Sequence, residues 1–177
     1  MITIISDDKE QKVGQRIREA LQRKGIETEY VSVSNADIKP CYGCGGCTYK
    51  TYGKCVIRDD TDEIFTKLIR SEVMLLVTPV TWGSYSYQIK KFMDKCAVIG
   101  DRHYYIVKGE IVKGIQGDIK KLYAVGVKEE CSKEEKDTFR GLVAENINIM
   151  NINGDSCIIG NYPSDQDISD IIEGMAG

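Results

Sequence analysis

The chain has 177 residues, of which 42% are hydrophobic and 29% charged, and its formal net charge is −3. This length and composition are typical of one globular domain with a sizeable core. The slightly negative charge excludes a global basic field for nucleic acid or anionic lipid, and no apolar run approaches the roughly 20 residues of a membrane helix. The first residues are apolar with no preceding basic stretch, so we expect no signal peptide and a cytoplasmic protein with reduced thiols.

Short apolar runs alternate with helical patterns along the chain, which predicts a parallel sheet with crossover helices. The predicted strands, in chain order, are Ile2–Ile5, Ile26–Val33, Val73–Val77, Leu122–Val127 and a segment near Cys157–Ile159. The helices between and after them place apolar residues at helical spacing: Val13, Ile17 and Leu21; Ile64, Phe65, Leu68 and Ile69; Ile89, Phe92, Met93 and Cys96; Phe139, Leu142 and Val143; Ile168, Ile171 and Ile172. Gly25 is a stop signal for the first helix, and the pairs Asp60/Glu63 and Ser132/Glu135 predict capping boxes at two others.

Five strands with interleaved helices predict a flavodoxin-like three-layer α/β fold, with a parallel sheet in the order 2-1-3-4-5 and helices on both faces. We expect one such domain over residues 1–177. Right-handed crossovers place the loops after the strands at one edge of the sheet, where ligands of open α/β sheets bind. Residues 99–121 form an irregular insertion whose pattern is compatible with a short hairpin, a lid or a dimer contact.

Four of the seven cysteines fall in one short segment. They are Cys41, Cys44, Cys47 and Cys55, spaced C-x2-C-x2-C-x7-C in a cysteine-rich loop of residues 40–58. Thiolates are soft ligands, and four sulfurs suit an iron–sulfur cluster or zinc. The spacing favours a 4Fe–4S cluster, with zinc or free thiols as alternatives. Because the loop follows the second predicted strand, we expect it at the ligand-binding edge of the sheet.

The remaining candidates for chemistry carry weaker signals. We interpret Cys96, Cys131 and Cys157 as packing residues or incidental thiols. His103, the only histidine, lies in a segment without a regular pattern and is typical of a solvated side chain.

A second motif follows the third predicted strand. It reads Thr-Pro-Val-Thr-Trp-Gly-Ser-Tyr-Ser at residues 78–86 and Gln-Ile-Lys-Lys-Phe-Met-Asp at residues 88–94. This resembles the NAD(P)H-dependent FMN reductase superfamily, whose members carry a Ser-Pro-Val-Tyr-Trp-type loop and then a Leu-Lys-x-Phe-x-Asp-Arg helix. The pair Asp59 and Asp60 after Cys55 also matches, and the clustered cysteines resemble the iron–sulfur flavoprotein branch of that superfamily.

The resemblance implies FMN as cofactor, NAD(P)H as electron donor, a cluster on the four cysteines, and a homodimer or homotetramer. A loop of small residues can offer backbone N–H groups to the flavin rim while an aromatic side chain covers one face of the ring. For Trp82, a core position is the alternative. The resemblance assigns these residues to flavin binding: Ser6, Pro79, Val80, Thr81, Trp82, Gly83 and Ser84. No catalytic acid or base is assigned.

The chain departs from the family in two places. After the first strand the family binds the FMN phosphate with a Gly-Ser-x-Arg turn, and only Ser6 matches it here. Asp7 and Asp8 follow, and such residues cap helix N–H groups and repel phosphate. Three interpretations follow: the phosphate is held by Ser6 and backbone groups, a flavin binds weakly as a substrate, or flavin binding is lost. In the cysteine loop, seven residues precede the fourth cysteine, where the resemblance implies about five.

Together the motifs predict an FMN-dependent oxidoreductase that passes electrons from a donor such as NAD(P)H through flavin to a cluster. The donor and acceptor are small molecules or proteins, and we expect no nucleic acid or membrane partner. The alternatives are a non-enzymatic electron carrier or redox sensor, and a degenerate relative without flavin.

Overall fold

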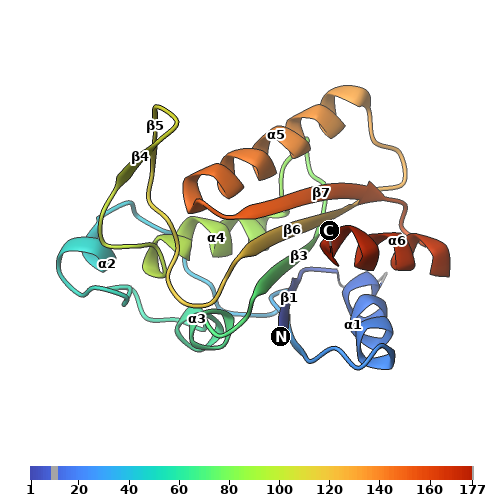
Figure 1. The fold of residues 1–177 in the computed structure, drawn as a ribbon, viewed down its shortest axis with the longest axis horizontal. Helices are drawn as coiled ribbons and strands as arrows, with labels where there is room; N and C mark the ends of the chain where they lie inside the picture. The colour runs from blue at the N-terminus through green and yellow to red at the C-terminus, as the bar shows by residue number, and fades with distance from the viewer. Residues whose placement is uncertain (9–11, 177) are drawn as a thin grey trace.

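The computed structural model describes residues 1–8 and 12–176 as a sheet of five parallel strands with helices on both faces (Figure 1). The strands are β1 (Ile2–Ser6), β2 (Thr28–Ser32), β3 (Val73–Pro79), β6 (Lys121–Val127) and β7 (Asn153–Ile159), in the order β2-β1-β3-β6-β7. The helices are α1 (Val13–Arg23), α2 (Gly46–Tyr49), α3 (Thr61–Leu68), α4 (Tyr87–Lys95), the 3-10 turn η1 (Cys96–Val98), α5 (Lys133–Met150) and α6 (Asp165–Ala176). The predicted flavodoxin-like order 2-1-3-4-5 is confirmed.

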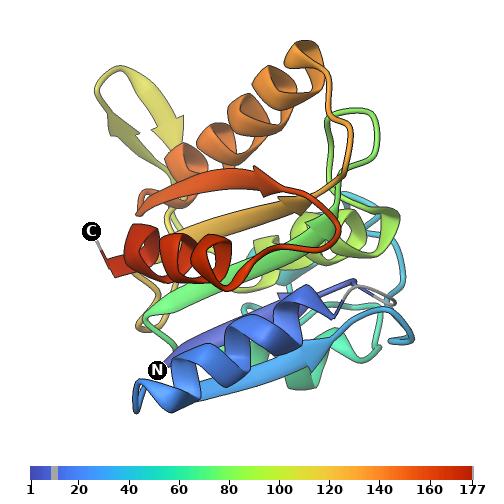
Figure 2. The ribbon, with the colours of Figure 1, turned by 90° about the vertical axis from the view of Figure 1, so that its right-hand side faces the viewer.

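Two apolar clusters form the core, one on each face of the sheet. Helices α1 and α6 lie side by side on one face (Figure 2), where Ile17 and Ile171 are buried with Val125 of β6. On the other face, Phe92 of α4 and Phe139 of α5 are fully buried. The predicted inward faces are confirmed, except that Ile69 and Leu142 are only half-buried.

The strand boundaries differ most at the edges of the sheet. β7 begins at Asn153, four residues before the predicted start, because the first half of this edge strand is exposed and polar and carries no apolar signal. β2 is shorter than predicted, since the N–H of Ile26 donates to the carbonyl of Leu21 and closes helix α1 instead.

One predicted capping box is confirmed and the other is wrong. At α5, Ser132 and Glu135 make both reciprocal bonds. At α3, the carboxylate of Asp60 accepts from the N–H of Asp37 at 2.8 Å. Instead, the N–H of Thr61, the first residue of α3, donates to the carboxylate of Asp59 at 3.0 Å. An ion pair with Lys95, described below, holds Asp59 at this helix start.

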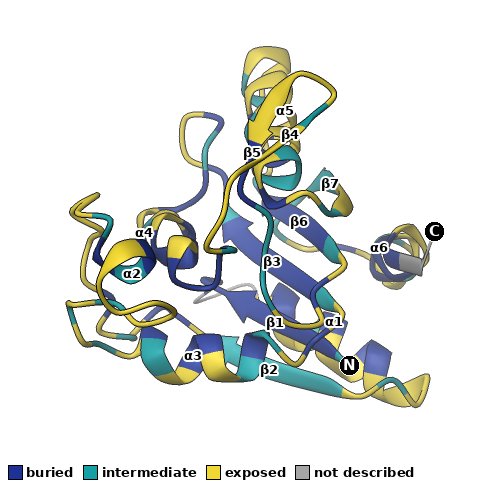
Figure 3. Cartoon of the chain, turned by 60° about the vertical axis from the view of Figure 1, so that its left-hand side comes forward, coloured by how far each residue is buried: buried dark blue, intermediate teal, exposed yellow. Residues whose placement is uncertain are grey.

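The insertion at residues 99–121 contains an antiparallel hairpin of β4 (Tyr105–Val107) and β5 (Glu110–Val112). The hairpin stands away from the main sheet and its surface is mostly exposed (Figure 3), including the side chains of Ile106 and Ile111. Of the three possibilities, the hairpin is what the chain forms. A groove of about 800 Å³ lies between it and the end of α5, away from the motifs.

Candidate functional site

The four motif cysteines come together around one small cavity of about 30 Å³. Cys41 and Cys44 are exposed, and Cys47 and Cys55 are half-buried. The opposite wall comes from the end of α4 and the η1 turn, through Lys95, Ala97 and Val98. All four motif cysteines therefore line the same cavity.

Backbone N–H groups point at two of these sulfurs. The N–H of Gly43 lies 3.4 Å from Sγ of Cys41, and the N–H of Ile57 lies 3.4 Å from Sγ of Cys55. Such hydrogen bonds stabilise thiolate and tune the potential of a bound iron–sulfur cluster. The turn at Gly43 requires glycine, because its φ is +63°.

Four thiol groups around one cavity are the donor set of a zinc ion or of an iron–sulfur cluster. Within the part of the chain that the structure describes, no three His, Cys, Asp or Glu side chains are close enough to hold one metal ion. A tetrahedral zinc site needs four ligands around one centre. A multi-iron cluster also needs four thiolates, which bind different iron atoms.

A buried ion pair anchors the cysteine loop to the sheet. Nζ of Lys95 on α4 pairs with the carboxylate of Asp59, and neither side chain has exposed surface. Nζ also lies 3.4 Å from the carbonyl of Ile57, two residues after the last motif cysteine. Asp59 further accepts from the N–H of Lys39 at 2.7 Å and from the N–H and hydroxyl of Thr61. Burial alone would raise the pKa of Asp59, but the Lys95 ammonium and the other donors hold that pKa below its usual value.

The second motif forms a tight turn at the carboxyl edge of the sheet. Thr81 and Ser84 exchange backbone hydrogen bonds of 3.0 and 2.9 Å. Trp82 and Gly83 between them both have positive φ, 55° and 74°, as in a type I′ turn. A bulky residue rarely adopts this conformation, and such outliers concentrate at functional sites.

The turn exposes an aromatic side chain. The Trp82 side chain is 89% exposed, so the core position considered for it is wrong. The N–H groups of Val80, Thr81 and Ser84 are taken by backbone carbonyls. In residues 1–8 and 12–176, no partner bonds the N–H of Trp82 or Gly83. Gly83 is buried against α5, so the exposed surface of the turn is that of Trp82.

The phosphate end is different. Ser6 is fully buried at the end of β1, and its hydroxyl donates to the carboxylate of Asp8. The same carboxylate accepts from the N–H of Gly14, in the first turn of α1, at 2.8 Å. The carboxylate of Asp7 accepts from the hydroxyl of Ser86, the N-cap of α4. Among the described residues, the Ser6 hydroxyl and the Gly14 N–H, two groups that could bind an FMN phosphate, are bonded to Asp8, and the Ser86 hydroxyl is bonded to Asp7. Residues 9–11 of the same loop lie outside the described residues.

The cysteine cavity does not lie at the carboxyl edge, where we expected it. The loop leaves this edge after β2, but its cavity is lined by the far end of α4. Thr48 of α2 accepts from Nζ of Lys113 at 2.7 Å, and the N–H of Lys113 bonds Ile149 in the last turn of α5. The expectation failed because the long loop runs along the α4 face and away from the strand end that it follows.

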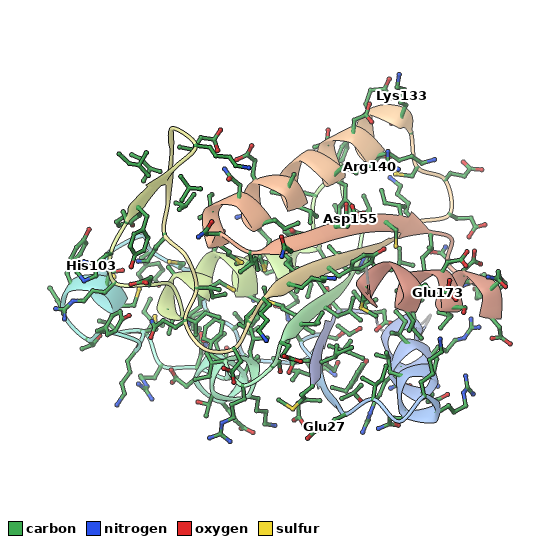
Figure 4. All side chains as sticks on the ribbon, viewed as in Figure 1. Glu27, His103, Lys133, Arg140, Asp155 and Glu173 are labelled. Atoms are coloured by element: carbon green, nitrogen blue, oxygen red, sulfur yellow. The ribbon has the colours of Figure 1, made fainter. Side chains whose placement is uncertain are left out.

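Two polar residues at these sites, Ser34 and Lys95, lie outside the quoted motifs and were not predicted. The hydroxyl of Ser34 and Oε1 of Gln88, the first residue of the helix motif, are buried at the carboxyl edge with no partner among the described residues. Lys95 directly follows the helix motif, which ends at Asp94. His103 is exposed on the outer side of the molecule, far from the sheet edge (Figure 4), as expected for a solvated histidine. Lys133 is likewise exposed at the start of α5.

A parallel sheet of this order, with helices on both faces, defines a flavodoxin-like α/β fold. Residues 6–116 match the family described as NADPH-dependent FMN reductase, and the chain belongs to this family. The resemblance carried by the two motifs is thus confirmed.

The sequence is also similar to iron–sulfur flavoproteins of archaea. It is 43% identical over 82 residues to one from Methanocaldococcus jannaschii, which is 45% of this chain and 42% of that protein. It is 36% identical over 113 residues to one from Archaeoglobus fulgidus, which is 63% of this chain and 47% of that protein. It is 33% identical over 86 residues to one from Methanosarcina thermophila, which is 49% of this chain and 44% of that protein. These matches span less than half of each relative.

Solved structures share the fold at low identity. An NAD(P)H:quinone oxidoreductase from Methanothermobacter marburgensis superposes with a TM-score of 0.68 at 14% identity, covering 99% of this chain and 93% of that one. An FMN-dependent NADH-azoreductase from Bacillus anthracis gives 0.62 at 10% identity, covering 99% and 97%. Among the described helices, none is long and apolar enough to cross a bilayer.

Proposed function

We propose that this chain is a flavin-dependent oxidoreductase that receives electrons from a donor such as NAD(P)H and passes them to a 4Fe–4S cluster on Cys41, Cys44, Cys47 and Cys55. Family membership supports FMN as the flavin, and the names of the archaeal relatives support the cluster. The observation that carries the proposal is the meeting of all four cysteines around one cavity, with N–H groups directed at two sulfurs.

The chain's own residues have distinct roles in this proposal. The thiolates hold the cluster, and the Gly43 and Ile57 amides offset their negative charge. Lys95 lies on the cavity wall with its charge paired to Asp59, so it holds the loop rather than adding a net charge. At the other site, the turn at Trp82 and Gly83 offers donors and an aromatic surface to the ring. Flavin, when bound, converts between two-electron and one-electron transfer.

Three expectations stay predictions that accompany this proposal. They are a single domain over residues 1–177, a cytoplasmic location, and a homodimer or homotetramer. The exposed aromatic residues of the cysteine loop and hairpin, Tyr42, Tyr49 and Tyr104, are compatible with subunit contact.

Iron and sulfide analysis after anaerobic reconstitution tests the cluster. We expect about four irons per chain in the wild type and a large loss in Cys47→Ser, because a cubane cluster needs four thiolates. Cys131→Ser is the control, since Cys131 lies after β6 and outside the cavity. Equal iron in the wild type and Cys47→Ser would contradict the assignment.

Electron entry is tested separately, with added flavin and either NADH or NADPH under anaerobic conditions. Bleaching of the flavin and cluster absorbance by a nicotinamide supports the oxidoreductase. The carboxylates of Asp7 and Asp8 after β1 favour a second candidate, an electron carrier without nicotinamide oxidation. That candidate predicts a cluster that dithionite reduces and that NADH and NADPH leave oxidised.

A further inference from the structure

We propose that Lys113 supplies the positive charge of the cysteine cavity: its buried ammonium stabilises the negative charge of a bound iron–sulfur cluster and raises the reduction potential of that cluster. This inference rests on the proposed cluster and names a residue, outside both sequence motifs, that sets its potential. Lys113 does not bind iron in this proposal, and it acts on the cavity through its electric field.

The backbone of α5 places Lys113 beside the cysteine loop. The N–H groups of Lys113 and Gly114 both donate to the carbonyl of Ile149, in the last turn of α5, at 3.0 and 3.1 Å. The lysine side chain then crosses Gly100, where an added Cβ would lie 2.7 Å from Cε of Lys113. The small residue at position 100 therefore leaves room for the lysine to reach toward the cysteine loop.

The ammonium ends next to the residue that follows a motif cysteine. Nζ of Lys113 donates to Oγ1 of Thr48 at 2.7 Å, and Thr48 directly follows Cys47. Lys113 lines a cavity of about 260 Å³, and Ala97 lines both this cavity and the cysteine cavity. Lys113 and the motif cysteines therefore border neighbouring cavities that share a wall.

The charge of Lys113 is buried and has no anionic partner in the described structure. Lys113 is 9% exposed. Within residues 1–8 and 12–176, no carboxylate oxygen lies within 4.0 Å of its Nζ. Besides Thr48, the ammonium contacts the ring of Tyr104, whose centroid lies 5.2 Å away. Because an unpaired buried charge is costly, lysine is rarely buried in this way without an anion.

The carboxylates around this position are engaged elsewhere. Asp94 lines the same cavity as Lys113, but it pairs with Lys90 where both side chains are 47% exposed. Asp101, whose N–H bonds the residue after Lys113, accepts from the hydroxyl of Tyr105 at 2.8 Å. Neither carboxylate neutralises the ammonium, so its charge is available to an anion in the neighbouring cavity.

A thiolate-ligated iron–sulfur cluster is such an anion. Four thiolates outweigh the charge of the iron–sulfur core, and the added electron makes the reduced cluster more negative still. A fixed positive charge therefore stabilises the reduced form more than the oxidised form and raises the potential. Lys95 does not have this effect, because its charge is paired with Asp59.

The test is a redox titration of the reconstituted cluster, with dithionite as the electron donor and absorbance and electron paramagnetic resonance as readouts. In Lys113→Met, the ratio of reduced to oxidised cluster at a fixed potential should fall at least about threefold, or about 28 mV for one electron. Lys113→Gln keeps a donor for Thr48 without the charge and should show the same shift. Lys113→Arg keeps the charge, has room in the neighbouring cavity, and should shift the ratio less than half as much.

Lys54→Met is the control, because it removes an exposed positive charge directly before Cys55. Its shift should be smaller and should vanish at about 1 M salt, where exposed charges are screened beyond about 3 Å. The shift in Lys113→Met should persist at that salt concentration, because the charge that it removes is buried.

Iron content separates the two ways in which this inference can fail. If the wild type binds no iron, the proposed cluster fails and the inference fails with it. If the cluster is present, equal potentials in the wild type, Lys113→Met and Lys113→Gln would overturn the inference alone, as would an equal shift in Lys113→Arg. If Lys113→Met bound no iron, the comparison of Lys113→Gln with Lys113→Arg would decide in the same way.

Discussion

Replacing Asp59 by alanine should destabilise the protein by about 3–5 kcal/mol, because it leaves the buried ammonium of Lys95 without its anion. Neither side chain of this pair has exposed surface. The substitution also removes the acceptor of three further hydrogen bonds, from Lys39 and from both groups of Thr61. At roughly 2–4 °C per kcal/mol for a chain of this size, the melting temperature should fall by about 6–20 °C.

Lys95→Met should cost less, about 1–3 kcal/mol, since the buried carboxylate of Asp59 keeps its other donors. The double variant should be no less stable than Asp59→Ala alone, because both buried charges are then gone. The two effects should therefore be non-additive by about 1 kcal/mol or more, which is at least the effect of Lys95→Met alone. Near-additive effects, within about 0.5 kcal/mol, would refute the ion pair as the anchor of the loop.

Urea unfolding of the metal-free protein, followed by circular dichroism, measures these values. Lys90→Met is the matched control, because Lys90 lies on the same helix and pairs with Asp94 where both side chains are 47% exposed. An exposed pair of this kind contributes about 0–1 kcal/mol. Iron content after reconstitution gives a second readout. It should fall in Asp59→Ala because the segment that follows Cys55 loses its ion pair with Lys95 on α4.

Three further predictions follow from burial and packing. Because the pKa of Asp59 is lowered in the folded state, its contribution to the free energy of unfolding is complete above pH about 4 and is lost as the pH falls through the folded pKa. In Asp59→Ala, the free energy of unfolding should therefore fall less steeply at acidic pH than in the wild type. Burial raises the pKa of Cys157 to about 11, so about one Cys157 thiol in a thousand is ionised at pH 8. Iodoacetamide should therefore label the exposed Cys41 before Cys157, as followed by mass spectrometry, and equal labelling rates would contradict this. Gly154→Ala should destabilise by about 1–3 kcal/mol in urea, since its Cβ would lie 2.0 Å from a backbone oxygen, while Gly141→Ala, in open space on α5, should gain up to about 1 kcal/mol.

The sheet could be predicted because its central strands are continuous apolar runs. β3 is buried through five of its seven residues, and its neighbours repeat this pattern. The edge strand β7 was predicted only in its second half, where side chains are partly covered. Hydrophobic patterning indicates burial, so it does not predict the part of an edge strand that is exposed to solvent.

The sites could be predicted as motifs but less well as positions. The spacing of the cysteines indicated one cavity, and the structure brings them to one. Their place at the far end of α4 depends on contacts of α2 with η1 and with Lys113, which sequence patterning cannot report. The helix cap at Asp59 was assigned to Asp60 for the same reason, because the choice is made by Lys95, 36 residues away in the sequence.

Helix α4 joins the two candidate sites, and this has a consequence for electron transfer under the proposed function. Its N-cap, Ser86, is bonded to Asp7 at the flavin edge, and its last residue, Lys95, is bonded to Asp59 at the cysteine cavity. Nine residues at about 1.5 Å each separate these ends by roughly 13 Å. Because a buried aspartate fixes each end, this distance is a constant of the chain. Under the proposed function, a flavin at the Trp82 turn and a cluster in the cysteine cavity would therefore lie at opposite ends of α4 in one chain.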